Sequence, residues 1–184
     1  MHHNFRLAGL AFVVALFATA LIGPAGASAR CETGGASPAE VDMCTPTAKA
    51  RLLDNGMLVP PASAPARVKR VIAAANKIRT KPYIYGGGHA RWWDRGYDCS
   101  GAVSYALHGG EFLESPLPSG PMEKWGLGGE GRWITVYANG GHAYAVIAGV
   151  RWDTSGDSGR ETGPRWHTDL RDNVGFTPRH PAGF

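Results

Sequence analysis

The spacing of hydrophobic residues predicts two helices in the middle of the chain. Ser63 can cap the first helix, and Pro82 ends it because proline has no backbone N–H to continue the hydrogen bonding. The apolar positions of this helix, which recur at helical spacing, are Val68, Val71, Ile72, Ala75 and Ile78. Asp98 is a good N-cap for the second helix, and Gly109-Gly110 stops it. The residues that this second helix keeps on one face are Cys99, Ala102, Val103, Ala106 and Leu107.

Strand patterns follow the two helices along the chain. Residues 133–138 alternate as a strand, and Asn139-Gly140 is a strong hairpin signal after which residues 142–148 run back. Arg151-Trp152-Asp153 continues the sheet, and residues 174–179 are predicted to form a last strand. Helices that precede an antiparallel sheet define the α+β fold class.

The N-terminus has the pattern of an export signal. Met1 to Arg6 is short and positively charged, the run from Leu7 to Ile22 is almost wholly apolar, and Ala27-Ser28-Ala29 is a small-x-small cleavage site. The alternative is a membrane anchor, but a spanning helix needs about 20 apolar residues. We therefore expect residues 1–29 to be a cleaved signal peptide, with no stable membrane insertion afterwards and a secreted or cell-wall location.

Export places the three cysteines in an oxidising compartment. Cys31 and Cys44 lie close together in a segment with Gly, Pro and Ser, so they are expected to form a disulfide. Residues 30–64 are interpreted as a disulfide-pinned arm and residues 65–184 as the domain that follows it. Cys99 is then the odd thiol, and catalysis is one explanation for a free thiol in a secreted protein. Whether the arm blocks the site until it is removed stays open.

Charge and composition narrow the range of partners. The chain of 184 residues has 19 Lys and Arg against 15 Asp and Glu, which fits an anionic polymer such as a cell wall. Nucleic acid is not expected, because no basic cluster interleaves with aromatic residues in a recognisable binding module. A zinc site from Cys99, His142 and His180 is not expected, because no close ligand pair supports it. We expect no cofactor and a monomer.

Cys99 and His142 together indicate thiol chemistry. A cysteine at a helix start has the positive end of the helix dipole against its sulfur, which lowers the thiol pKa. Gly140-Gly141-His142 opens a strand and offers a base that could face Cys99. A third group must orient the imidazole, and Asp153 is the best candidate. The other candidates for this role are Thr154, His167 and His180.

Three blocks of the sequence resemble a known family. They are Tyr83-Ile84-Tyr85-Gly86-Gly87, Asp98-Cys99-Ser100-Gly101-Ala102-Val103 and Gly141-His142-Ala143. From about Pro65 onward the chain resembles the NlpC/P60 family of cell-wall cysteine peptidases. The resemblance implies a papain-like α+β fold, with N-terminal helices packed on an antiparallel sheet. It also implies cleavage of peptidoglycan stem peptides, commonly between D-glutamate and diaminopimelate.

The resemblance also assigns roles to individual residues. Cys99 is expected to be the nucleophile and His142 the base, while Tyr83 lines the substrate site. Asp98 and Ser100 are expected to help hold the free amino end of the stem peptide. The backbone N–H of Cys99 points out of the helix start, so it is the natural oxyanion donor.

Three other functions and one structural question stay open. On the same fold, the chain could be an N-acetylmuramoyl-L-alanine amidase or an acyl-transfer enzyme, or a non-catalytic cell-wall-binding protein. Trp92 and Trp93 either line the groove or pack a long loop.

Overall fold

The computed structural model describes residues 49–156 and 163–184. The chain divides into two units, Met1–Thr45 and Pro46–Phe184, and the second contains all the described residues. The predicted signal peptide and the predicted disulfide between Cys31 and Cys44 lie outside the described residues. Across the described part of the chain, no helix has the length and apolar character that crossing a membrane requires.

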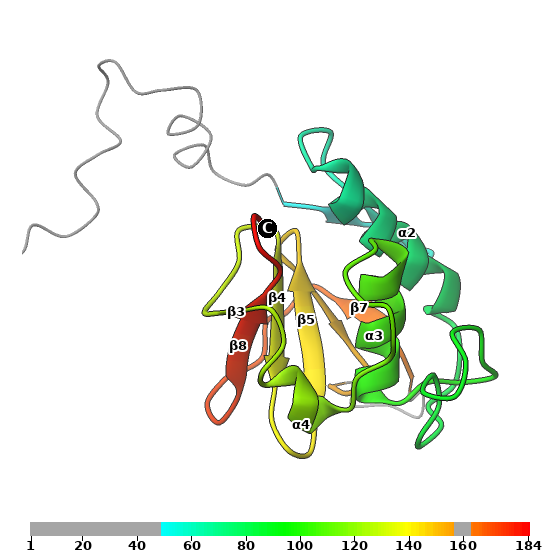
Figure 1. Cartoon of the computed structure of the whole chain (residues 1–184). Coiled ribbons are helices and arrows are strands. Elements are labelled where there is room, and N and C mark those ends of the chain that lie inside the picture. Colours follow the sequence, from blue (N-terminus) through cyan, green and yellow to red (C-terminus); the bar gives the residue numbers. More distant parts are fainter. Residues whose placement is uncertain (1–48, 157–162) are drawn as a thin grey trace, which may run out of the picture. The chain divides into compact units, whose positions relative to one another are not determined.

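Three helices and eight strands make up the described part of the second unit (Figure 1). The helices are α2 (Ala66–Ile78), α3 (Cys99–Gly109) and α4 (Ser119–Met122). The strands are β1 (Arg51–Leu52), β2 (Leu58–Val59), β3 (Leu127–Gly128), β4 (Ile134–Ala138), β5 (Ala143–Ile147), β6 (Val150–Asp153), β7 (Arg165–His167) and β8 (Thr177–His180). Helices followed by an antiparallel sheet confirm the predicted α+β class.

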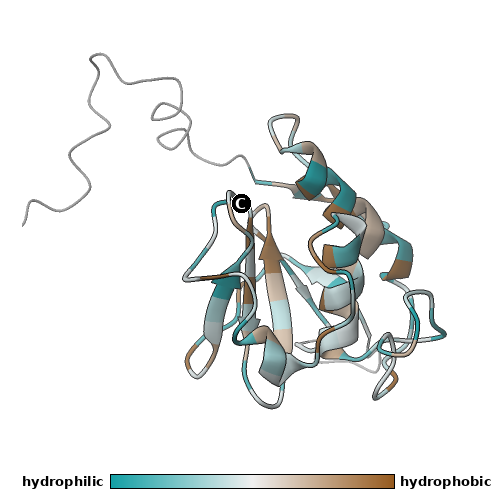
Figure 2. Ribbon diagram, viewed as in Figure 1, coloured by the Kyte–Doolittle hydropathy of each residue, from teal (hydrophilic) through white to brown (hydrophobic). Residues whose placement is uncertain are grey.

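The main sheet has six strands in the order β3-β8-β4-β5-β6-β7, and every neighbouring pair is antiparallel. Helices α2 and α3 lie side by side next to the sheet (Figure 1). Hydrophobic colours prevail along β4 and β5, whereas α2 carries both hydrophilic and hydrophobic residues (Figure 2). The indole N–H of Trp152 on β6 donates to the carbonyl of Ala102 at 3.1 Å, which links the sheet to α3.

Alternation along β4 and β5 divides the sheet into two faces. Val136 and Ala145 belong to the buried hydrophobic core, together with residues of α2 and α3. Tyr137 and Tyr144, directly opposite each other on the two strands, line a hollow instead. One face of the sheet therefore packs in the core, and the other bears a polar and aromatic hollow.

Gly109 and Gly110 end α3, as predicted, but their main role is packing. Gly110 is the C-cap residue with φ −91°, so it does not use the left-handed conformation that favours glycine. A Cβ at Gly109 would collide with the Cβ of Ala74, and one at Gly110 would collide with the side chain of Val71. The two glycines therefore let α2 and α3 approach closely.

Several predicted boundaries differ from the structure. Pro65, not Ser63, occupies the N-cap position of α2, and no side chain caps that end. The helix ends at Ile78, before Pro82. The last strand is shorter than predicted and starts at Thr177, while β3 and β7 were not predicted. The missed strands have two and three residues, too short for an alternation pattern to show.

The folded unit extends to the N-terminal side of residue 65, where composition placed the start of the domain. Strands β1 and β2 pair as a hairpin, and Leu58 on β2 is buried in the core. The amide side chain of Asn76 on α2 accepts from the backbone N–H of Leu58 and donates to its carbonyl, both at 2.9 Å. These hydrogen bonds fasten β2 to α2, so part of the predicted arm belongs to the compact unit.

Candidate active site

Cys99 is the first residue of α3, and the residues on either side of it hold the helix start in place. The carboxylate of Asp98 caps the helix by accepting from the backbone N–H of Gly101 at 2.7 Å. The carbonyl of Gly87 accepts from the N–H of Asp98 at 3.2 Å. A Cβ at Gly101 would collide with that same carbonyl, so only glycine allows this approach. The Asp-Cys-Ser-Gly block thus places the thiol at the positive end of the helix dipole.

The β4–β5 hairpin brings His142 to Cys99. The side chain of Asn139 accepts from the backbone N–H groups of Gly141 and His142, both at 2.9 Å. The N–H of Asn139 in turn donates to the carbonyl of His142 at 3.0 Å. The predicted hairpin is confirmed, but neither Asn139 nor Gly140 has a positive φ, so the turn is not of the type that Asn-Gly usually forms.

Cys99 shares a hydrogen bond with the imidazole of His142. Burial raises the pKa of the Cys99 thiol, but hydrogen bonds from His142 and from the backbone N–H of Ala143 outweigh it. The net effect lowers the pKa of Cys99 below its ordinary value. The thiol is only partly buried and belongs to no disulfide, so it is available to a substrate.

Asp153 lies on the other side of the imidazole. Its Oδ1 is 2.9 Å from Nε2 of His142, and its side chain is fully buried. Burial lowers the pKa of His142, but the hydrogen bonds with Asp153 and Cys99 raise it to about 9. Burial raises the pKa of Asp153, but the hydrogen bond with His142 and further donors lower it to about 2. Because Nε2 faces Asp153, Nδ1 is the nitrogen left for Cys99.

The three other residues considered for the orienting role lie elsewhere. Thr154 follows Asp153, and its buried Oγ1 has no hydrogen-bond partner among residues 49–156 and 163–184. His167 is on β7, paired with Arg151. Nδ1 of His180 is 3.1 Å from the carbonyl of Gly129, near the sheet edge formed by β3 and β8. Of the four candidates, Asp153 is therefore the residue that the structure brings to the imidazole of His142.

Asp98 and Ser100 are occupied by contacts within the protein. Oδ2 of Asp98 accepts from the N–H of Gly86 at 3.1 Å. In addition to Gly101, Oδ1 contacts Nε2 of His89 at 2.9 Å and the hydroxyl of Ser100 at 3.2 Å. Reasoning from the sequence missed His89, since a single histidine in a Gly-rich loop carries no signal of a carboxylate partner.

Aromatic residues surround the start of α3. Tyr83 is 38% exposed, and burial, Cys99 and Asp98 raise its pKa, which places it beside Cys99. Trp92 stacks on His108 at 3.9 Å and packs against the core. Trp93 is 57% exposed, with the ammonium of Lys81 4.4 Å from its ring centroid. Trp92 therefore packs the loop, and Trp93 faces outward.

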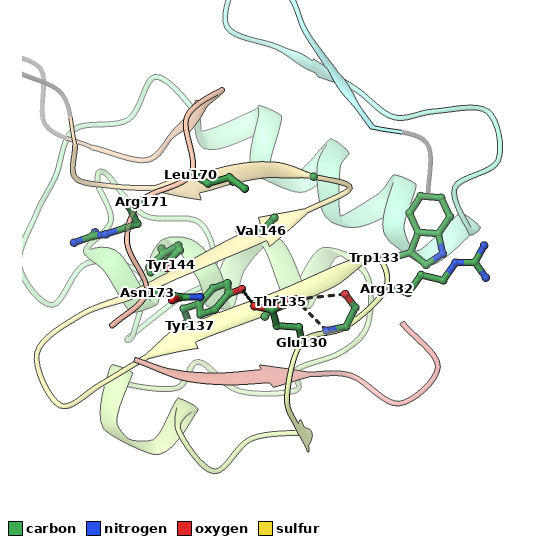
Figure 3. Close-up of a pocket in the computed structure, with 12 residues that line it drawn as sticks. Glu130, Arg132, Trp133, Thr135, Tyr137, Tyr144, Val146, Leu170, Arg171 and Asn173 are labelled. Atoms are coloured by element: carbon green, nitrogen blue, oxygen red, sulfur yellow. Dashed lines mark hydrogen bonds between the residues drawn. The ribbon is translucent and has the colours of Figure 1, made fainter. Parts of the chain in front are cut away.

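The hollow on the other face of the sheet has a volume of about 350 Å³ and does not include Cys99 or His142 (Figure 3). Its floor includes Tyr137 and Tyr144, whose rings stack 5.0 Å apart. Arg171 lies at one end of the hollow beside Tyr144, and Arg132 lies at the other end.

Comparisons with known proteins found distant similarities. No protein-family model and no curated relative matches this chain. Three solved structures from Mycobacterium tuberculosis are similar to it. A hypothetical invasion protein is 18% identical, with 61% of each chain covered and a TM-score of 0.46. The peptidoglycan hydrolase RipB is 24% identical, with 66% of this chain and 68% of its own covered and a TM-score of 0.48.

The third structure is RipD, described as a non-catalytic NlpC/p60 domain protein adapted to peptidoglycan binding. It is 19% identical, with 63% of this chain and 98% of its own covered and a TM-score of 0.45. This chain spans less than two thirds of the hypothetical invasion protein. The RipD description names the family that the three sequence blocks resemble.

Proposed function

We propose that this chain is a cysteine peptidase of the cell wall that cleaves peptidoglycan stem peptides between D-glutamate and diaminopimelate. The observation that supports the proposal is the placement of His142 between Cys99 and Asp153. A thiol with a lowered pKa beside a histidine with a pKa of about 9 favours a thiolate and an imidazolium near neutral pH. Such a pair supplies both the nucleophile and the proton that acyl transfer needs.

The geometry supports a two-step reaction. The Cys99 thiolate attacks the carbonyl carbon of the scissile amide, and the resulting oxyanion lies near the backbone N–H of Cys99 at the start of α3. Protonated His142 gives its proton to the leaving amine as the C–N bond breaks, which leaves a thioester on Cys99. Neutral His142 then takes a proton from water as the water attacks the thioester, and the thiolate leaves. Because Nε2 of His142 stays hydrogen-bonded to Asp153 in both steps, Nδ1 is the nitrogen that donates and accepts the protons.

The substrate assignment combines the sequence resemblance with the surroundings of Cys99. Tyr83 is partly exposed beside the nucleophile and is proposed to line the substrate site. Asp98 and Ser100 are proposed to hold the amino end of the stem peptide, which requires the substrate to take the place of His89 on Asp98. The basic charge of the chain and the N-terminal export pattern are consistent with action in the cell wall.

Mass spectrometry of the products formed from diaminopimelate-type peptidoglycan tests the proposal. The wild-type chain is expected to release stems shortened between D-glutamate and diaminopimelate. Cys99→Ala is expected to release none, and Cys99→Ser, which keeps the size of the side chain, should lose nearly all turnover. Release of intact stem peptides from the glycan would instead show that the chain is an amidase. No product, together with a Cys99 thiol that resists alkylation near neutral pH, would contradict catalysis altogether.

A further inference from the structure

The second oxygen of the Asp153 carboxylate has its own set of partners. While Oδ1 faces His142, Oδ2 accepts from Nη1 of Arg151 at 2.8 Å and from Nη1 of Arg171 at 3.1 Å. The side chain of Asp153 has no exposed surface, so the carboxylate of both ion pairs lies out of water, where charge interactions are stronger. The carboxylate that orients the imidazole is therefore held by two guanidinium groups.

The two arginines differ in their other contacts. Arg151 is buried and divides its hydrogen bonds between the carboxylates of Asp153 and Asp169, the carbonyl of Asp169 and the carbonyl of Ser155. Its positive charge therefore pairs with two carboxylates, and a substitution of Arg151 would disturb several segments at once. Arg171 has a 32% exposed side chain, and Nη1 donates only to Asp153 and to the hydroxyl of Ser155 among the described residues. A substitution of Arg171 is therefore the more selective test of how the Asp153 carboxylate is held.

Aromatic rings hold Arg171 close to the catalytic histidine. Its guanidinium carbon lies 5.2 Å from the ring centroid of Tyr144 and 5.3 Å from that of Phe176. The ring of His142 lies 6.4 Å and 6.3 Å from the same two rings. Figure 3 shows Arg171 beside Tyr144 at the end of the hollow. Arg171 and His142 therefore share two aromatic neighbours and one carboxylate.

We propose that Arg171 is a positioning residue of the Cys99–His142 pair: it holds Oδ2 of Asp153 so that Oδ1 stays on His142, and its positive charge lowers the pH at which the pair becomes active. The effect on turnover rests on the proposed function. The effect on the reactivity of the Cys99 thiol does not, because that reactivity can be measured without a substrate.

The charges around His142 give the direction of the effect. The titratable groups that face it are Cys99 from α3, Asp153 with its partner Arg151 from β6, and Arg171 from the segment between β7 and β8. Tyr144 on β5 stays neutral near pH 7, because burial and the neighbouring Tyr137 raise its pKa to about 12. Loss of the positive charge of Arg171 favours the protonated form of both Cys99 and His142. The pH range in which the Cys99 thiol is reactive is then expected to move to higher pH.

Three substitutions separate the charge of Arg171 from its hydrogen bonds. Arg171→Met removes both, Arg171→Gln keeps a donor without charge, and Arg171→Lys keeps the charge without the planar fork. Arg179→Met is the matched control, because the side chain of Arg179 donates to the backbone carbonyls of Trp125 and Gly126, away from His142. Thermal unfolding of each variant shows whether it is folded.

The first readout is the rate of Cys99 alkylation by iodoacetamide across pH, with peptide mapping to identify the labelled cysteine. The profile is expected to move to higher pH in Arg171→Met and Arg171→Gln, and to stay near wild type in Arg171→Lys and Arg179→Met. The second readout is hydrolysis of stem peptides. Arg171→Met is expected to lower kcat about tenfold or more, since small displacements of catalytic groups cost that much. KM should stay within about twofold, and Arg171→Gln should recover part of kcat.

Each result either supports or overturns the proposal. A folded Arg171→Met with the wild-type alkylation profile and wild-type kcat would overturn it. So would an Arg171→Lys profile shifted as far as that of Arg171→Met, or losses of the same size in Arg179→Met. If the alkylation profile moves as expected but no variant, including wild type, cleaves stem peptides, then the proposed function fails and the role of Arg171 stands.

Discussion

Two histidine–aspartate pairs lie beside the start of α3, and their distances are the same. His142 and Asp153 are 2.9 Å apart, and so are His89 and Asp98. The carboxylate of Asp98 also accepts from two backbone N–H groups and from the hydroxyl of Ser100, so this pair fastens a loop to the helix cap. The carboxylate of Asp153 lies between two arginines, and its histidine reaches Cys99.

The comparison shows that the distance between a histidine and a carboxylate does not define the role of the pair. What differs is that, of these two imidazoles, the one of His142 also reaches a thiol. His142 shares a hydrogen bond with the thiol of Cys99, whereas Nε2 of His89 contacts Asp98 and the hydroxyl of Ser100. Removing members of the two pairs in parallel therefore separates catalysis from local structure.

The largest expected difference is between the two histidines. His142→Ala is expected to lower kcat about a thousandfold, because the thiolate loses its cation and the leaving amine loses its proton donor. His89→Ala is expected to change kcat by less than about tenfold and to act mainly on KM. Steady-state hydrolysis of stem peptides and iodoacetamide labelling of Cys99 measure both. Equal losses of kcat in the two variants would show that the pairs do not have separate roles.

The two carboxylates are expected to differ in stability as well. Asp153→Asn leaves Arg151 buried beside a neutral side chain and is expected to cost about 3 kcal/mol, as broken buried ion pairs do. Asp98→Asn keeps a capping oxygen but loses its charge at the helix N-terminus, which costs about 1 kcal/mol. Urea unfolding near pH 7 measures both free energies. A smaller loss in Asp153→Asn than in Asp98→Asn would contradict the comparison.

The third expected effect is the dependence of stability on pH. The folded pKa of Asp153 is lowered to about 2, so its contribution is fully present above its ordinary pKa of about 4 and is lost as the pH falls through 2. The folded pKa of His142 is raised to about 9, so its contribution is fully present below its ordinary pKa of about 6.5 and is lost as the pH rises through 9.

The free energy of unfolding, measured from pH 4 to pH 10, tests the alkaline part of this dependence, which His142 controls. His142→Gln is expected to remove much of the alkaline fall in stability, while His89→Gln is expected to keep it. An unchanged alkaline fall in His142→Gln would show that another group causes it.

Local patterns predicted the elements that present the thiol and the base. Helical spacing and Asp98 predicted α3 with Cys99 at its start, and Asn139-Gly140 predicted the hairpin that delivers His142. These signals work because capping, helical periodicity and turn formation depend on residues close together in the chain. The short strands β3 and β7 escaped prediction because they exist only through pairing with distant partners, β8 and β6.

The partners of Asp153 show where prediction from the sequence ends. Asp153 was one of four residues considered for the orienting role, and no local pattern ranks it above the others with certainty. The pairing of β5 with β6 decides the matter by bringing Asp153 to His142. Arg171, 18 residues further along the chain, and the Asp98 partner His89 left no sequence signal, because a charged side chain chooses its partner through space.

By itself, the sequence determined the α+β class, a cysteine at a capped helix start and a histidine at the head of a strand, since each follows from interactions within a few residues. Only the tertiary structure decided which carboxylate meets His142, which arginines hold that carboxylate and which histidine covers Asp98. Those choices depend on strand register and on the packing of loops against the sheet, where residues far apart in the chain share a buried, low-dielectric site.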